Sequence, residues 1–293
     1  MFAYMDASTL RNKTQQLVNL VATVPNTNGS NPLLPTSRIA NGEFAYRDQF
    51  PHHALIIIDN YGTCGGSLID VSYILTTTYC TLQGSTFYVA LGLTDMDTAD
   101  SDVVTLISRT AIIHESYNSV DFSNNIAIIK LHDSVTLNFF VRLVSLPSFS
   151  DSDNTFEGQD VQVSGWGETS SSSILGLTYL SLSAPPPDDT SPGGKLLRYI
   201  NTHVMSNLEC AKVYPGSYIQ PSVLCTDGTG HKGIHHGDSG SPLVINNDGG
   251  YVQIGIASFH SENGCSVSSP SAYTRVTSHL AWISDNTNMY IMP

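Results

Sequence analysis

Gly237-Asp-Ser-Gly-Ser-Pro-Leu243 is the stretch of this 293-residue sequence that decides its fold. Alone, a turn of glycine, serine and proline could be an ordinary loop. Four further strings accompany it along the chain: Arg38-Ile-Ala-Asn-Gly42, Cys64-Gly-Gly-Ser-Leu-Ile69, Ser164-Gly-Trp-Gly167 and Pro270-Ser-Ala-Tyr-Thr-Arg-Val276. Together the five strings cover residues 39–287, so they describe one large domain rather than a local motif.

Short apolar runs separated by turn residues fill the sequence after Ile39. Their β-branched and aromatic content and their spacing are typical of β-barrels. Strands are predicted at 54–58, 73–76, 87–91, 103–113, 126–131, 161–166, 243–245 and 252–258. One late helix is predicted at Val276–Ser284, where apolar residues recur at i, i+4 and i+7.

The five strings resemble those of the chymotrypsin-like, or trypsin-like, serine endopeptidases. The resemblance implies an all-β fold of two six-stranded antiparallel β-barrels with a C-terminal helix and an active site in the cleft between the barrels. It divides the chain into a propeptide-like segment, 1–38, and a protease domain, 39–293. Ser239 takes the nucleophile position. The backbone N–H groups of Gly237 and Ser239 take the positions that stabilise the oxyanion.

Both partners of the nucleophile are replaced. The family's histidine directly precedes a cysteine that bonds back to Cys64, but Thr76-Thr-Thr-Tyr-Cys80 places Tyr79 there, where it is expected to fill the space of the imidazole. The family's aspartate position holds Asn125, and Asp121 is four residues too early. A phenol with pKa near 10 is about one part in a thousand ionised at pH 7. Losing either partner costs about 10⁴ to 10⁶ in turnover, so no working protease is expected.

The resemblance also implies an activation step and a specificity pocket. Cleavage after Arg38 would free the ammonium of Ile39 to pair with Asp238. Gly233 lies where trypsin-like enzymes carry an aspartate at the pocket floor, so no preference for Arg or Lys is implied. The other expected pocket residues are Ser258, His260 and Ser271.

Five cysteines look like two closely spaced pairs and one left over: Cys64 with Cys80, Cys210 with Cys225, and Cys265. In the family Cys265 would bond to a cysteine where this chain has His235. Cys265 is then either an inert buried thiol or part of a metal site with His235, His236 and His260. Side chains at consecutive positions tend to point apart, which argues against the metal, and the sequence predicts neither a metal nor a cofactor.

Charge and composition restrict the partners. With 12 basic and 25 acidic residues the formal net charge is −13, which repels phosphate backbones and anionic headgroups. There is no run of about 18 apolar residues, so no membrane span is expected. The cysteine pattern and two glycosylation sequons favour an extracellular protein whose signal peptide has been removed. A long surface loop is predicted at 168–195.

We therefore expect a secreted, catalytically inactive serine protease homologue of arthropod type that acts by binding protein, as a decoy, a cofactor or a recognition module. No cysteine precedes Arg38, so the disulfide-knotted regulatory module of some inactive arthropod homologues is absent from this sequence. Two alternatives stay open: an active hydrolase that uses unusual groups, and a structural or storage protein.

Overall fold

A computed structural model describes residues 42–59, 62–98, 100–167, 196–214, 216–247, 250–261 and 268–293. The predictions about the segment 1–38, Arg38, Ile39, the 168–195 loop and Cys265 fall outside these residues.

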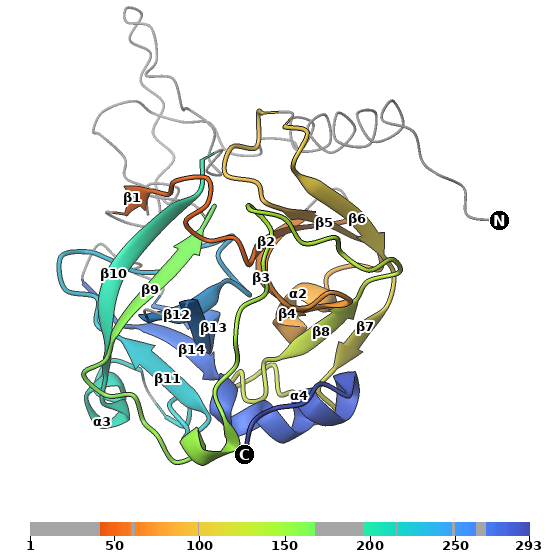
Figure 1. Cartoon of the computed structure of the whole chain (residues 1–293). Coiled ribbons are helices and arrows are strands. Elements are labelled where there is room, and N and C mark those ends of the chain that lie inside the picture. Colours follow the sequence, from red (N-terminus) through yellow and green to blue (C-terminus); the bar gives the residue numbers. More distant parts are fainter. Residues whose placement is uncertain are drawn as a thin grey trace, which may run out of the picture.

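The first half of the described chain forms one curled antiparallel sheet with the strand order β6-β5-β2-β3-β4-β8-β7 (Figure 1). Its strands are β2 (His53–Ile58), β3 (Gly62–Asp70), β4 (Tyr73–Thr76), β5 (Phe87–Leu91), β6 (Val104–Ser108), β7 (Ala111–Ile113) and β8 (Ala127–Lys130). The end strands β6 and β7 are separated by only Arg109 and Thr110, so the predicted strand at 103–113 is divided into two. The hydroxyl of Ser108 donates to the Lys130 carbonyl and accepts from the Thr110 N–H at this break.

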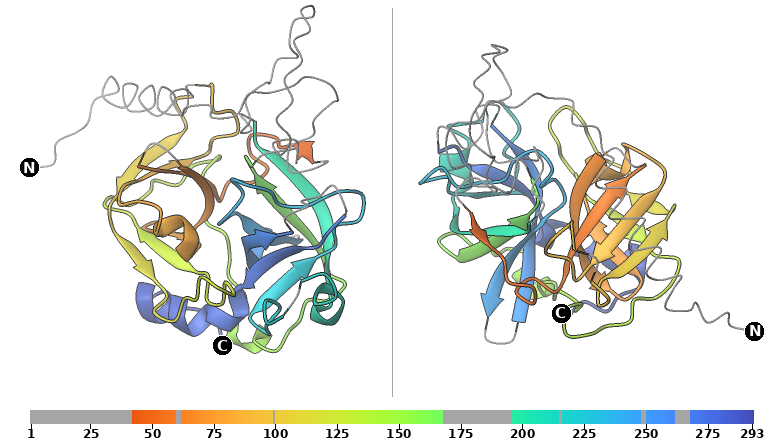
Figure 2. Two further views of the ribbon diagram at one scale, coloured as in Figure 1. Left: turned by 180° about the vertical axis from the view of Figure 1, so that it is seen from behind. Right: turned by 90° about the horizontal axis from the view of Figure 1, so that it is seen from above.

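The second half forms the sheet β1-β10-β11-β14-β13-β12-β9, which the additional pairing of β10 with β9 closes into a six-stranded barrel with β1 at its edge. Its strands are β1 (Glu43–Phe44), β9 (Asp160–Gly165), β10 (Arg198–Met205), β11 (Val223–Thr226), β12 (Pro242–Asn247), β13 (Gly250–His260) and β14 (Ser271–Arg275). Seen from above, the two sheets lie side by side (Figure 2).

The prediction of an all-β fold with a C-terminal helix is confirmed, with two differences in detail. The first sheet curls into a half-barrel of seven strands, and the described residues contain no pairing between β6 and β7 that would close it. The C-terminal helix begins as the 3₁₀ turn η3 (Val276–His279) and continues as α4 (Leu280–Thr287). It therefore ends at Thr287, three residues later than the predicted Val276–Ser284, and is capped by Asn288 with φ 56°.

Three short helical segments and two disulfides complete the framework. The segments are α2 (Thr78–Thr81), α3 (Asn207–Cys210) and the 3₁₀ turn η1 (Phe149–Asp151). The predicted cysteine pairs are confirmed: Cys64–Cys80 joins β3 to α2, and Cys210–Cys225 joins α3 to β11. These bonds fix both short helices on their barrels, which a single turn of helix could not achieve by its own stability.

One hydrophobic core connects the two halves. Leu55 and Ile128 of the first sheet, Val244 and Ile256 of the second, and Leu280 of the C-terminal helix belong to the same buried cluster. Burying apolar surface contributes about 25 cal/mol per Å², so this shared core holds the two sheets in a fixed relation. Because the two sheets are held in place by this core, residues from both halves can lie at one site.

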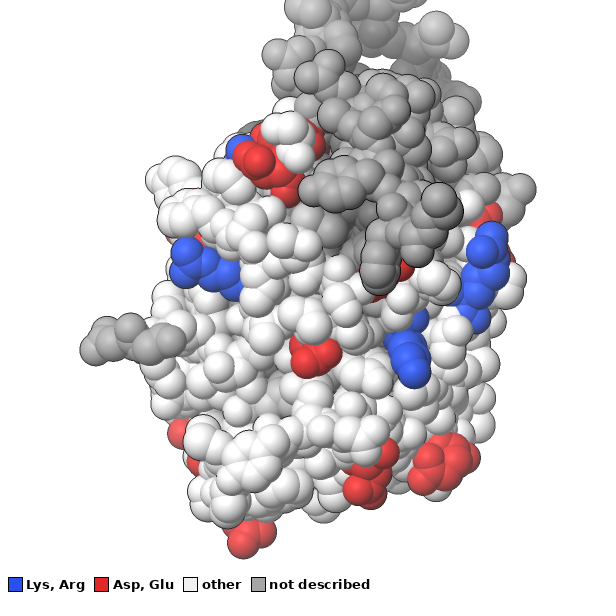
Figure 3. All heavy atoms as spheres, turned by 45° about the vertical axis from the view of Figure 1, so that its right-hand side comes forward, with Lys and Arg blue, Asp and Glu red and all other residues white. Residues whose placement is uncertain are grey.

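The surface shows how the acidic excess is distributed. On the face drawn in Figure 3 acidic side chains lie in separate groups, with basic side chains between them, and most of the face is uncharged. In the described part of the chain we find no helix that is both long and apolar enough to cross a membrane.

Candidate functional site

Ser239 lies on a tight turn that precedes β12. Two glycines with left-handed backbone shape this turn, Gly237 with φ 94° and Gly240 with φ 87°. A Cβ atom at Gly240 would collide with the carbonyl oxygen of Gly65 and the hydroxyl of Thr76, so only glycine fits there. The Ser239 carbonyl accepts a 2.8 Å hydrogen bond from the Gly65 N–H, which fastens the turn to β3 in the other half.

The backbone N–H groups of Gly237 and Ser239 make no hydrogen bond to another described residue. Free N–H donors at these two positions are what the oxyanion assignment requires. Their role as oxyanion donors stays a prediction.

Asp238 is fully buried between the turn and β9. Its carboxylate accepts hydrogen bonds from the N–H of Gly167 at 2.7 Å and the N–H of His235 at 2.9 Å. Side chains at Gly165 or Gly167 would run into the carboxylate, which explains the glycines of the 164–167 string. Burial outweighs the two hydrogen bonds and raises the pKa of Asp238 to about 7. Its predicted partner Ile39 is outside the described residues.

Tyr79 and Asn125 are in contact through the Tyr79 backbone, and Tyr79 is 45% exposed. That the Tyr79 ring takes the space of the family's imidazole stays a prediction. Asn125 is fully buried and uses both ends of its amide: Oδ1 accepts from the Tyr79 N–H at 3.0 Å and Nδ2 donates to the Ser258 hydroxyl at 2.8 Å. Ser258 reaches Asn125 from a register irregularity in β13. The Ser239 carbonyl oxygen lies 3.4 Å from the sulfur of Cys80, which follows Tyr79.

His52 and His53 are buried, and neither serves Ser239. His53 lies within the core, with Nδ1 2.6 Å from the Ser164 hydroxyl and Nε2 3.4 Å from the Ser241 hydroxyl. Burial lowers its pKa well below the usual value, and His52 beside it adds to the shift. Among the described residues, none makes a hydrogen bond to the Ser239 hydroxyl.

The predicted pocket residues come together from two elements. Gly233 is buried, and the next residue, Ile234, donates its N–H to the Ser271 hydroxyl at 3.1 Å. His260 at the end of β13 pairs in register with Ser271 of β14. The structure thus gathers Gly233, His260 and Ser271, while Ser258 points toward Asn125 instead.

Three histidines converge beside these residues. The ring centroids lie 5.1 Å apart for His235 and His236, 5.0 Å for His235 and His260, and 5.0 Å for His236 and His260. The expectation that consecutive side chains point apart is wrong here because residues 235–238 form a turn, closed by the Asp238 N–H on the His235 carbonyl. Side chains alternate in direction on a strand, not on a turn.

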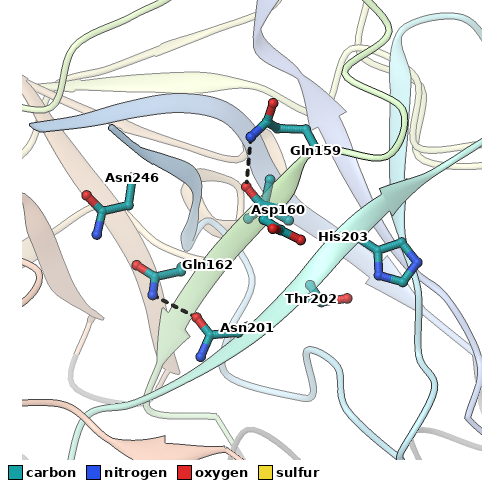
Figure 4. A pocket seen from close by; sticks show the side chains of 8 residues that line it. Gln159, Asp160, Gln162, Asn201, Thr202, His203 and Asn246 are labelled. Atoms are coloured by element: carbon teal, nitrogen blue, oxygen red, sulfur yellow. Dashed lines mark hydrogen bonds between the residues drawn. The ribbon is translucent and has the colours of Figure 1, made fainter. Parts of the chain in front are cut away.

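A separate hollow of about 590 Å³ lies on the second barrel (Figure 4). Its lining is polar and comes from β9, β10 and β12, and includes the pair in which Gln162 donates to Asn201 at 2.7 Å. It contains neither Ser239 nor any of the residues that the sequence singled out. No sequence pattern identified it.

Comparison with known proteins bears on the site described above. The family model Trypsin matches residues 39–185 and 187–283. Brachyurin of Leptuca pugilator is 36% identical over 252 residues, which are 86% of this chain and 99% of brachyurin. Chymotrypsin of Phaedon cochleariae is 34% identical over 85% of this chain and 82% of its own length. A solved structure of HL collagenase has a TM-score of 0.73 and 30% identity, and the match covers 86% of this chain and all of that one.

Proposed function

The chain belongs to the trypsin family of serine proteases, and we propose that it is a member without peptidase activity that works by binding another protein. The observation that carries the proposal is the pair of residues beside the nucleophile. Tyr79 stands where the family has its base, and Asn125 stands where the family has the carboxylate that orients that base.

The hydrogen bonds of Asn125 support the proposal that this residue no longer orients a catalytic base. A carboxylate in this place would accept hydrogen bonds and stabilise a cationic imidazole. The Asn125 amide is neutral, and its Nδ2 group points a donor at Ser258. If position 79 held a histidine, the Asn125 amide would favour the wrong tautomer of its imidazole, or would favour neither tautomer.

The surroundings of Tyr79 support the loss of the base. Tyr117 is its phenolic neighbour, and the pKa of Tyr117 is raised first by burial and then by the nearby Tyr79 hydroxyl. A group that is to accept the serine proton at neutral pH needs a pKa near 7. A phenol, whose ordinary pKa is near 10, does not meet that requirement.

Binding is the function that the retained parts support. The two disulfides fit a protein of an oxidising compartment, and we place it outside the cell. The turn around Ser239 and the pocket residues Gly233 and Ser271 keep a framework on which the relatives build a peptide site. A homologue with that framework and no base can hold a protein segment without cutting it.

Hydrolysis assays test the proposal. We expect no turnover of peptide or ester substrates above that of Ser239→Ala, before or after cleavage at Arg38, and no labelling of Ser239 by a fluorophosphonate. Turnover or labelling that disappears in Ser239→Ala would favour the alternative, an active hydrolase with unusual groups.

The double substitution Tyr79→His with Asn125→Asp separates a missing base from a collapsed site. Base and orienting carboxylate act as a unit, so we expect turnover from the double variant and little from either single one. The free N–H groups of Gly237 and Ser239 make this recovery possible. An inert double variant that keeps the wild-type melting temperature would show that the oxyanion turn or the pocket has changed as well.

A further inference from the structure

His235, His236 and His260 form a cluster that the proposed function does not use. Each can offer one ring nitrogen such that the three atoms all lie within 4.8 Å of one another. The residues come from two elements that are fixed independently, the turn before Ser239 and the end of β13. His235 is buried, His260 is partly buried and His236 is exposed, so the cluster has an inner and an outer side.

The inner side holds an imidazole nitrogen that lacks a partner. His235 is only 7% exposed, and its Nδ1 is buried without a hydrogen bond to any described residue. Leaving a buried polar atom unpaired is destabilising, and an ion that is bound in the functional state is one explanation for such an atom.

The ring of His260 is oriented as a metal ligand would be. Its Nδ1 lies 2.9 Å from the carbonyl oxygen of Ser261. Because a carbonyl can only accept, Nδ1 carries the hydrogen, and the lone pair is on Nε2. Metal-binding histidines characteristically donate their second N–H in this way, which fixes the tautomer and the ring direction.

From these contacts we infer that His235, His236 and His260 bind one zinc ion through three imidazole nitrogens. Zinc–nitrogen bonds of about 2.0–2.1 Å in a tetrahedron place neighbouring nitrogens about 3.4 Å apart. Because the three nitrogens lie within 4.8 Å of one another, each separation must shrink by at most about 1.4 Å for zinc to bind. Three imidazoles and no carboxylate suit zinc rather than calcium or magnesium.

Three imidazoles leave a fourth position for a tetrahedral zinc ion. Three protein ligands with one further position are the pattern of zinc sites that bind a water or an exchangeable ligand. His260 pairs in register with Ser271, so an ion held here lies next to the residues that the sequence assigns to the specificity pocket. Such an ion offers a carboxylate of a partner protein a point of attachment.

Zinc binding to the full chain, produced without a histidine tag, tests the inference. The thiol of Cys265 is first blocked with iodoacetamide, and residues 1–38 contain neither histidine nor cysteine, so neither competes. Calorimetric titration with zinc chloride should give one site per chain, and zinc should raise the melting temperature. Loss of an outer partner of a ligand costs about 10–100-fold in affinity, so His236→Ala and His260→Gln should each weaken binding by at least about 100-fold.

His132→Ala is the matched control, because His132 is an exposed histidine in the other half of the molecule and its ring lies 3.2 Å from the carboxylate of Asp133. We expect it to bind zinc as the wild type does. Because His235 is buried, the variant His235→Ala can fail to fold. The conclusion therefore depends on the variants of the exposed His236 and of His260. Equal affinities of the wild type and His236→Ala would overturn the inference, as would a wild type that takes up no zinc at tens of micromolar.

Discussion

At the scale of single residues, His52 shows how this fold treats an imidazole that has no function. It lies fully buried beside the rings of Phe50, at 6.3 Å, and Tyr251, at 5.0 Å. Neither ring nitrogen has a hydrogen bond to a described residue. Burial lowers the pKa of His52 to about 3, from an ordinary value of 6.5. The side chain therefore packs as an aromatic ring, and the burial of its unbonded nitrogens destabilises the fold.

The substitution His52→Phe should remove a pH dependence. A histidine whose folded pKa is lowered stabilises the fold fully above pH 6.5, and that stability is lost as the pH falls below 6.5 because the unfolded chain takes up the proton first. The unfolding free energy of His52→Phe relative to the wild type should therefore rise on acidification, by about 2–3 kcal/mol between pH 7 and pH 4. Urea unfolding at several pH values measures it.

The larger phenyl ring can change the free energy of unfolding by an amount that does not depend on pH. This amount cancels, because only the change of the free energy of unfolding with pH is interpreted. His132→Phe is the control, since this side chain is 86% exposed. Parallel pH profiles for the wild type and His52→Phe would contradict the burial of this histidine.

At the scale of elements, replacing a glycine in the turn at 237–241 destabilises the fold in two ways that can be measured separately, through backbone strain and through steric contact. Gly240 and Gly158 have similar backbones, with φ 87° and φ 78°. A Cβ at Gly240 meets the carbonyl of Gly65 and the hydroxyl of Thr76, whereas a Cβ at Gly158 meets nothing within 4 Å. Gly158→Ala should cost about 1 kcal/mol for the backbone strain alone, and Gly240→Ala at least about 3 kcal/mol.

Urea unfolding of both variants checks this prediction. The difference between them is the steric contribution of the contact between the two halves of the molecule. If the two alanine variants lost equal stability, the turn would not be packed against β3 and β4 as described.

Elements also show where prediction from the sequence ends. Apolar runs located the strands, and the string around Ser239 located the site, because both are local patterns. The break between β6 and β7 was missed because Ser108 takes a hydrogen bond from the Thr110 N–H, a side-chain bond that competes with the ladder. The histidine cluster was undervalued because its geometry depends on a turn at 235–238 and on the end of β13, which lie 22 residues or more apart in sequence.

At the scale of the whole molecule, the two halves depend on each other at the buried Asp238. The turn that holds Asp238 is bonded to Gly65 of the first sheet and to Gly167 after β9. No cation pairs with the carboxylate among the described residues, and burial raises its pKa to about 7. A carboxyl whose folded pKa is raised above its ordinary 3.8 contributes full stability only below about pH 4. That contribution is lost as the pH rises toward and past 7.

Cleavage at Arg38 should reverse this loss. The new ammonium of Ile39 has an ordinary pKa near 8, so it is charged at pH 7 and can pair with Asp238, which lowers the folded pKa of the carboxyl. We expect the cut and uncut chains to be about equally stable at pH 4, and the cut chain to be more stable by a few kcal/mol at pH 7. Thermal unfolding across this range measures it, with Arg38→Gln exposed to the same protease as the control for cuts elsewhere. Identical pH profiles for the cut and uncut chains would show that this homologue has lost the activation switch along with its base.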